Sequence, residues 1–210
     1  MSSVRRRLGN RAIGSMLIAG IALMLSGCSN PSDAASLKSG NISIEKLQAS
    51  VSKILEERIT FNTTPEDGLS GEELTRNTLG FHIFSALLKQ AAKERNVVAL
   101  PGDISARRAE VLQNVGGEQE LSVALVKAGI ASTDFEEYLA LIVLQDKIRQ
   151  VIAPTATEDA QVVEALQKML SDTAASENLS VNPRYGVWNT ANNRVEPADP
   201  TGGALPSGKQ

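Results

Sequence analysis

The chain has 210 residues, which is enough for one domain and hardly for two. Apolar residues make up 42% of it and charged residues 21%, the ordinary balance of a globular protein, while only 3% are aromatic, so the core must be mainly aliphatic. A single histidine and a single cysteine exclude a Cys/His zinc site and an internal disulfide, and a formal net charge of −3 argues against a nucleic-acid-binding protein.

The N-terminus has the pattern of a secretory signal. Residues 1–27 hold four arginines and no acid, and their apolar stretch, 13–25, is shorter than the about 20 residues that span a bilayer. A positive start followed by a short apolar run is typical of a signal peptide that is removed on export. Without residues 1–27 the chain has 17 basic and 24 acidic residues, a formal charge of −7.

The signal ends in Leu25-Ser26-Gly27-Cys28, which resembles a bacterial lipobox. The resemblance implies cleavage between Gly27 and Cys28 and a diacylglycerol on the Cys28 thiol. The mature protein would then be anchored on the outer face of the cytoplasmic membrane. Cys28 is the only cysteine of the chain, which favours this interpretation over a short membrane anchor with a chance cysteine. The arginine pair matches a twin-arginine signal poorly, so we expect general secretory export.

The mature chain is predicted to contain a tether, one helical domain and a tail. Residues 28–40 are rich in Ser and Ala with few apolar anchors, which is typical of a flexible linker. Residues 41–196 carry the apolar periodicity of helices. Residues 197–210 contain three prolines and three glycines and are expected to be disordered.

Six helices are predicted in the domain. Ser43 is a plausible N-cap for the first, and capping boxes that begin at Ser70 and Thr133 start the second and the fifth. The middle of the fifth helix is apolar on every side, which predicts that it is the central helix of the core. The predicted helices cover residues 42–59, 71–95, 104–115, a short stretch that ends at Gly129, 134–152 and 158–175.

The pattern changes after the last helix. Residues 179–188 alternate weakly, and residues 194–196 are expected to pair back with them across an Asn-Asn turn. This segment holds the only Trp, Trp188, together with Tyr185 and Arg184. Because Tyr and Trp can bury a ring while a polar tip stays hydrogen-bonded, we favour a clasp that fastens the C-terminal segment to the helices. A contact of these three residues with a client peptide or partner is the alternative.

Residues 40–188 resemble the SurA-like N-terminal chaperone domain of periplasmic SurA and PrsA-type foldases. Gly40-Asn41-Ile42-Ser43 is similar to the strand that enters the first helix of that family, and Gly116-Gly117 is similar to its helical hairpin. The most specific match is the V-N-P-R-Y-G-V-W ending at 181–188, which resembles actinobacterial lipoproteins of the group. The likeness covers about 150 of 183 mature residues. It implies a mainly α, SurA-N-like domain with a small β element formed by the start and end of the domain.

The chain departs from the foldases of this family at one place. They insert a parvulin prolyl isomerase domain before the last helix, whereas residues 152–155 run on here without an insertion. A parvulin domain also needs characteristic histidines, and the only histidine of this chain, His82, lies inside a predicted helix. The resemblance therefore implies the chaperone-like body without the isomerase.

The residues that could carry chemistry have simpler explanations. No Ser or Cys stands at a sequence spacing from His82 that would indicate a catalytic nucleophile. Segments 43–46 and 50–53 match the S-x-x-K motif of penicillin-binding proteins, but the companion motifs are in the wrong order and the chain is too short for that fold. The acid pairs 72–73 and 136–137 lie in first helical turns, where the helix dipole favours anions. We therefore expect no catalytic residue, no metal site and no cofactor.

The sequence as a whole favours a membrane-anchored, non-enzymatic, chaperone-like factor. Its partners would be unfolded or nascent secreted proteins, held as extended segments in shallow apolar grooves between helices. The alternative is an envelope binding module or regulator that docks one specific folded partner through an acidic helical surface. The sequence predicts no nucleic-acid partner, and it indicates no oligomeric state.

Overall fold

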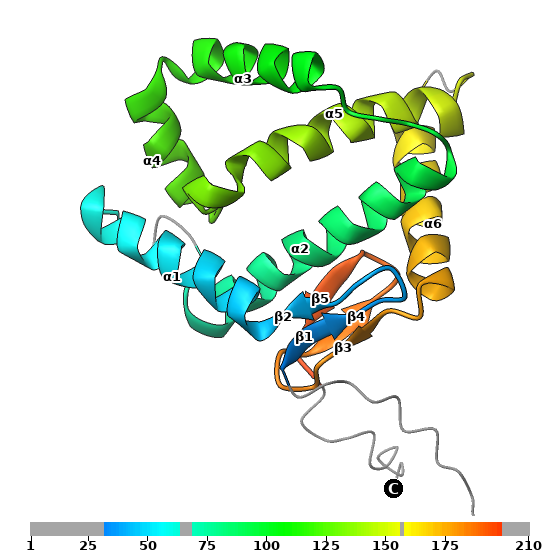
Figure 1. Ribbon diagram of the computed structural model, residues 1–210, viewed down its shortest axis with the longest axis horizontal. Helices are drawn as coiled ribbons and strands as arrows, with labels where there is room; N and C mark the ends of the chain where they lie inside the picture. Colours follow the sequence, from blue (N-terminus) through cyan, green and yellow to red (C-terminus); the bar gives the residue numbers. More distant parts are fainter. Residues whose placement is uncertain (1–31, 64–68, 156–157, 199–210) are drawn as a thin grey trace, which may run out of the picture.

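The computed structural model describes residues 32–63, 69–155 and 158–198 (Figure 1). The described chain is mainly helical with a small antiparallel sheet, as the sequence predicts. The predicted signal peptide, Gly27, Cys28 and the end of the tail lie outside the described residues. Among the helices that are described, none combines the length and the apolar character needed to span a membrane.

The predicted helices are all present, with small shifts at their ends. They are α1 (Ile44–Thr60), α2 (Gly71–Glu94), α3 (Pro101–Val115), α4 (Glu118–Ala128), α5 (Phe135–Ile152) and α6 (Asp159–Ser176), with a 3-10 helix, η2 (Ser132–Asp134), before α5. The strands are β1 (Asp33–Ser36), β2 (Ile42–Ser43), β3 (Ser180–Val181), β4 (Val187–Asn189) and β5 (Arg194–Glu196). The largest shift is at α3, which begins at Pro101 because proline suits the first position of a helix.

One of the three predicted caps forms. The Ser43 side chain accepts the backbone N–H of Lys46 at 3.0 Å and begins α1 as predicted. The capping box at Ser70 is wrong, because Gly71 turns the chain with a left-handed φ of +54° and the Ser70 side chain bonds no helix amide. The capping box at Thr133 is also wrong, because η2 incorporates this residue and α5 starts directly behind it.

The predicted tether is wrong from Asp33 onward. Residues 33–36 form β1, the middle strand of the sheet β2-β1-β3, and Ala34 and Ala35 are 0% and 2% exposed. Alanine and serine are weak strand formers, so the sequence pattern resembles a linker, but their small side chains let β1 lie close against the helices. A small β element between the two ends of the domain is confirmed, but the strand at Ile42, β2, pairs with β1, and it is β1 that pairs with β3 through Ala35↔Val181 and Ser36↔Ser180.

The predicted C-terminal hairpin is confirmed as well. It pairs Val187 with Glu196, Trp188 with Val195 and Asn189 with Arg194. Gly186, just before β4, has a φ of +127°, and a Cβ there would lie 2.0 Å from the carbonyl oxygen of Glu196. Only glycine therefore permits the close approach of the two strands at this point.

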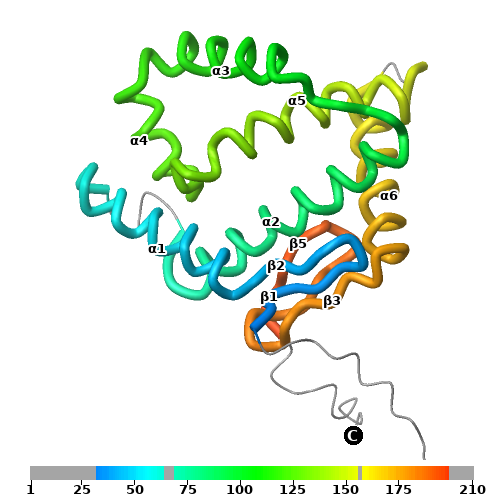
Figure 2. Tube along the Cα trace, viewed as in Figure 1, coloured from blue at the N-terminus to red at the C-terminus, as the bar shows by residue number. Residues whose placement is uncertain are grey.

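The central helix of the core is α2 and not α5. Figure 2 shows α2 running through the middle of the molecule, and it packs against α1, α5, α6, β1 and β5. Five of its apolar residues, Leu79, Ile83, Leu87, Leu88 and Ala91, are 0% exposed. The predicted core helix α5 serves two smaller roles, because its N-terminal half packs with α3 and α4 in a separate cluster and its C-terminal half joins the main core. Serving both clusters makes α5 apolar on every side, yet Ile142 is only half-buried.

Candidate functional site

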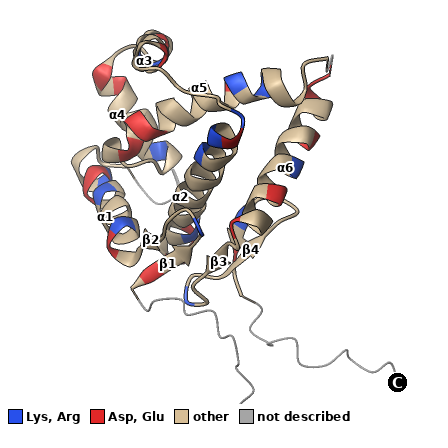
Figure 3. Cartoon of the chain, turned by 45° about the vertical axis from the view of Figure 1, so that its right-hand side comes forward, with Lys and Arg blue, Asp and Glu red and all other residues tan. Residues whose placement is uncertain are grey.

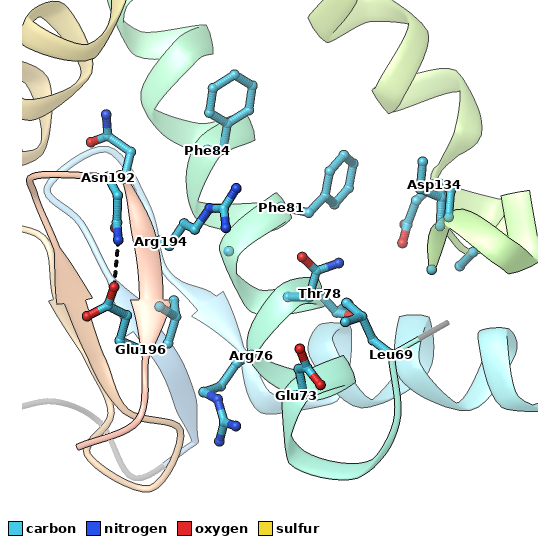
Figure 4. A pocket seen from close by; sticks show the side chains of 18 of the residues that line it. Leu69, Glu73, Arg76, Thr78, Phe81, Phe84, Asp134, Asn192, Arg194 and Glu196 are labelled. Carbon is cyan, nitrogen blue, oxygen red and sulfur yellow. Dashed lines mark hydrogen bonds between the residues drawn. The ribbon is translucent and has the colours of Figure 1, made fainter. Parts of the chain in front are cut away.

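A groove of about 700 Å³ lies over one face of α2 (Figure 4). Phe81 and Phe84 of α2 stand on its floor, half-buried and packed on the main core. Residues 192–197, which include β5, form one side, and the connection from α4 through Asp134 forms the other. Three segments that are distant in sequence therefore meet around two phenylalanine rings.

The floor follows from the spacing of residues along α2. Asn77, Gly80, Phe81 and Phe84 recur at helical intervals of three and four, so they share one face of the helix. Leu79 and Ile83, which lie on another face of the helix, are fully buried in the main core. A Cβ added at Gly80 would have no atom within 4 Å, so the floor is low at this point. Gly80 therefore leaves space in the groove that a larger side chain would occupy.

The sides of the groove carry charges of both signs. Arg76 pairs with Glu72 at 3.2 Å, and Glu196 accepts hydrogen bonds from the amides of Asn189 and Asn192, which lower its pKa. The side chains of three further lining residues form no hydrogen bond or ion pair with the described part of the chain. They are Glu73, Asp134 and Arg194. The groove thus combines an apolar floor with unpaired charges at its sides.

A second polar cluster lies along another face of α2, around Glu137 of α5. Its carboxylate accepts hydrogen bonds from Ser85 and Lys89 and pairs with Lys46 of α1 at 3.5 Å. Burial alone raises its pKa, but the hydrogen bonds from Lys89 and Ser85 and the charges of Lys89 and Lys46 outweigh it and lower the pKa of Glu137 to about 2. The carboxylate is therefore ionised at neutral pH, and it ties α5 to both α1 and α2.

His82 has a serine neighbour that the sequence interpretation missed. Its Nε2 lies 3.1 Å from Oγ of Ser50, which is 32 residues away on α1. A signal was present, because Ser50 falls on the same face of α1 as the buried Leu47 and Ile54. The pair closes the seam between α1 and α2.

The Ser50–His82 pair lacks the geometry of a catalytic dyad. The two side chains are 3% and 2% exposed, so no substrate reaches the hydroxyl. Nδ1 of His82 has no partner within the described part of the chain, so no carboxylate orients the ring. Burial, reinforced by the charge of Lys46, lowers the pKa of His82, and the ring is neutral at pH 7. Lys53, the lysine of the second S-x-x-K match, pairs instead with Glu56 and Glu57.

The residues predicted as a clasp lie outside the groove. Tyr185 and Trp188 are half-buried against the main core, and exposed Arg184 has its guanidinium carbon 6.0 Å from the centre of the Tyr185 ring. Trp188 is paired with Val195, which lines the groove, so the clasp supports the groove from behind. The packing of the two rings is what a clasp would need, but the hydrogen-bonded tip expected for Trp188 is not found, because its buried Nε1 has no partner among the described residues.

One acid of each predicted pair is held by an arginine. Glu72 pairs with Arg76, and Glu136 pairs with Arg108 at 2.8 Å. In the part of the chain that the structure describes, no three His, Cys, Asp or Glu side chains come together as a metal site would require. Glu72 therefore pairs within its own helix, whereas Glu136 links α5 to α3.

Comparison with known proteins gives no further guide to this site. No family model, no curated protein and no solved structure matches the chain. The groove itself was not predicted, although its signal was visible in the sequence. Two of the four phenylalanines of the chain, Phe81 and Phe84, stand three residues apart on the helix face that also carries Gly80.

Proposed function

We propose that the protein is a membrane-anchored, non-enzymatic, chaperone-like factor that holds unfolded or nascent exported proteins in the groove over α2. The observation that carries this proposal is the pair of half-buried rings, Phe81 and Phe84, on the floor of an open groove with polar sides. Such a floor offers apolar contact to many sequences, and open sides let an extended chain enter and leave. The resemblance of residues 40–188 to the SurA-like N-terminal domain supports the same function.

The short link to the anchor supports a role close to the membrane. Because β1 begins at Asp33, only residues 29–32 separate the ordered domain from Cys28. Five Cα steps span at most roughly 18 Å when fully extended. A diacylglycerol on Cys28 would therefore keep the domain next to the bilayer, where exported chains emerge, and its two acyl chains are enough for stable anchoring.

Three features support a function without catalysis. The Ser50–His82 pair is buried, and the carboxylate of Glu137 is occupied by Lys46, Ser85 and Lys89. The chain passes from Ile152 at the end of α5 to Asp159 at the start of α6 in a few residues, which leaves no room for an isomerase domain.

An aggregation assay with an internal enzymatic control tests the proposal. The full chain should slow the aggregation of a chemically denatured test protein at several-fold molar excess. It should leave unchanged a refolding reaction limited by prolyl isomerisation, whose uncatalysed time of tens to hundreds of seconds makes modest catalysis visible. Failure to slow aggregation would contradict the proposed chaperone function. A refolding rate that rises with protein concentration would remove its non-enzymatic character.

The alternative, docking of one folded envelope partner, is favoured by a different surface. Leu55 and Ile59 lie one turn apart on α1 and are 46% and 84% exposed. The surface is not uniformly acidic, since Figure 3 shows acidic and basic segments interspersed on α1, α2 and α6. Crosslinking in intact cells separates the two functions, because a chaperone gives many exported proteins and a docking module gives one stoichiometric partner.

A further inference from the structure

The geometry points to one binding mode for the groove: the client lies as an extra strand along β5, with a large apolar side chain over Phe81 and Phe84 and a basic side chain toward Glu73 and Asp134. This inference rests on the proposed function and specifies the class of peptide that the groove takes. The occupant is thus an extended, mixed apolar and basic segment of an exported protein.

The first support is the open edge of β5. This strand pairs only with β4 among the described residues. Every residue from 192 to 197 lines the groove. Side chains alternate between the two faces of a strand, so a strand that lines a groove with one face contributes every second residue. Consecutive lining residues indicate instead that the edge of the strand borders the groove. At least one residue of the three-residue β5 must turn its N–H and C=O away from β4, as an antiparallel ladder requires.

The second support is the shape of the floor beside that edge. Figure 4 shows β5 on one side of the pocket, Phe81 and Phe84 rising from α2, and Asp134 on the far side. A strand added to β5 would run over the low point at Gly80, where a Cβ would meet no atom within 4 Å. Backbone pairing along an edge, with pockets for alternate side chains, is the usual geometry of strand addition.

The third support is charge complementarity. Acids outnumber bases among the lining residues. The acids are Glu73, Asp134 and Glu196, and the bases are Arg76 and Arg194. Of these, Glu73, Asp134 and Arg194 form no ion pair with any described residue, whereas Arg76 is paired with Glu72, so two unpaired carboxylates stand against one unpaired guanidinium. The unpaired carboxylates favour a basic residue of the client, and the formal charge of −7 after residue 27 acts in the same direction.

Filling the floor tests the location. We would measure binding of a fluorescent ten-residue peptide of alternating Thr and Val, with one central Phe and one Lys, to the full chain in mild detergent. Gly80→Leu should lower the affinity at least tenfold without lowering the thermal midpoint, because leucine is a better helix former than glycine. Gly102→Leu is the matched control, since a Cβ at Gly102 of α3 also meets nothing within 4 Å, and it should leave affinity unchanged. An unchanged affinity in Gly80→Leu would overturn the inference.

Backbone methylation tests strand addition itself. N-methyl groups on alternate residues of the peptide block hydrogen bonds along one edge only. Methylation of one edge should lower the affinity by roughly fivefold or more, the equivalent of one lost hydrogen bond, and methylation of the other edge should not. Equal effects of the two methylation patterns would overturn the strand mode.

Charge variants test the peptide class. Replacing the Lys of the peptide by Glu should weaken binding several-fold at low salt. Glu73→Gln combined with Asp134→Asn should abolish that preference, whereas Glu164→Gln, at an exposed position of α6 outside the groove lining, should retain it. A preference that persists in the double variant, or none in the wild type, would contradict the basic-residue assignment.

The aggregation assay separates this inference from the proposed function. If the protein slows aggregation equally well with Gly80→Leu, the chaperone function stands and the groove over α2 is wrong. If neither peptide binding nor slowed aggregation is seen with the wild type, both fail.

Discussion

Glu137 attaches α5 to α1 and α2 through its carboxylate. It receives hydrogen bonds from Ser85 and Lys89 of α2 and pairs with Lys46 of α1, so one carboxylate joins three helices. Its neighbour Glu136 instead pairs with exposed Arg108 on the surface. Removing the charge of Glu137 should therefore lower the free energy of unfolding more than removing the charge of Glu136.

The pH dependence of stability should report Glu137. Its pKa of about 2 in the folded chain is below the ordinary 4.5, so the ionised form stabilises the fold above pH 4.5 and this contribution is lost as the pH falls towards 2. The shift corresponds to about 2–3 kcal/mol after allowance for the partly exposed lysines. Glu137→Gln should therefore lower the free energy of unfolding in urea by about that amount at pH 7 and by much less at pH 2.

Glu136→Gln is the control for this measurement. Its carboxylate is exposed, and removal of a surface pair costs about 0–1 kcal/mol. Equal losses in the two variants at pH 7 would contradict the assigned role of Glu137.

His82 should give a separate pH effect. Its pKa in the folded chain is lowered from 6.5 by burial, so the unfolded chain binds the proton more readily and stability falls as the pH drops below 6.5. His82→Gln keeps a polar side chain beside Ser50 and should flatten the pH dependence of stability just below pH 6.5. Because the chain has one histidine, a single NMR titration measures the pKa directly. A value at or above 6.5 would contradict the buried neutral ring.

At the scale of elements, apolar periodicity predicted the six helices. It did not predict strand β1, whose buried residues have small side chains. The six helices have apolar residues at intervals of three and four, and this local pattern is enough to predict a helix without knowledge of its neighbours. Strand β1 buries Ala34 and Ala35, which carry little apolar signal, and its pairing with β3 is a long-range contact that no local pattern records. The same limit explains why α5 looked central, since apolar residues on every side do not say how many clusters they serve.

Two matched isoleucines distinguish the roles of α2 and α5. Ile83→Ala in α2 removes a fully buried side chain from the main core and should lower the free energy of unfolding by about 2–5 kcal/mol. Ile142→Ala in α5 removes a half-buried one and should cost about 1 kcal/mol. Chemical denaturation of the two variants measures both values. A larger loss at Ile142 would restore α5 as the central helix.

The groove could be predicted from the sequence only in part. Phe81, Phe84 and Gly80 share one helix face, but a phenylalanine that faces a groove looks the same in sequence as one that faces the core. The sides come from residues 192–197 and from the segment before α5, and only the folded topology brings them to α2. By contrast, Tyr185 and Trp188 stood out by their scarcity, and both rings pack against the main core, although the buried Nε1 of Trp188 has no hydrogen-bond partner among the described residues.

At the scale of the whole molecule, the proposed anchor on Cys28 would act together with the sheet. Strand β1 lies in the sheet that joins both ends of the domain, and it begins five residues after Cys28. A lipid on Cys28 would thus hold the sheet close to the bilayer rather than let the domain move on a long tether.

Membrane fractionation of a Cys28→Ala variant tests the anchor. Loss of the thiol removes the site of the diacylglycerol, so the variant should appear as an uncleaved precursor or as a released form. Immunoblots of membrane and soluble fractions distinguish these products from the wild type. A processed, mature-sized variant that stays with the membrane would contradict lipidation.

The central claim is that exported chains bind over α2, and site-specific photocrosslinking in intact cells tests it most directly. We would place benzoylphenylalanine at position 84 on the groove floor and, as the control, at position 187, where exposed Val187 lies on β4 outside the groove lining. The account predicts adducts with several different exported proteins from position 84 and few from position 187. Adducts that form from position 187 but not from position 84, or a single partner at position 84, would contradict it.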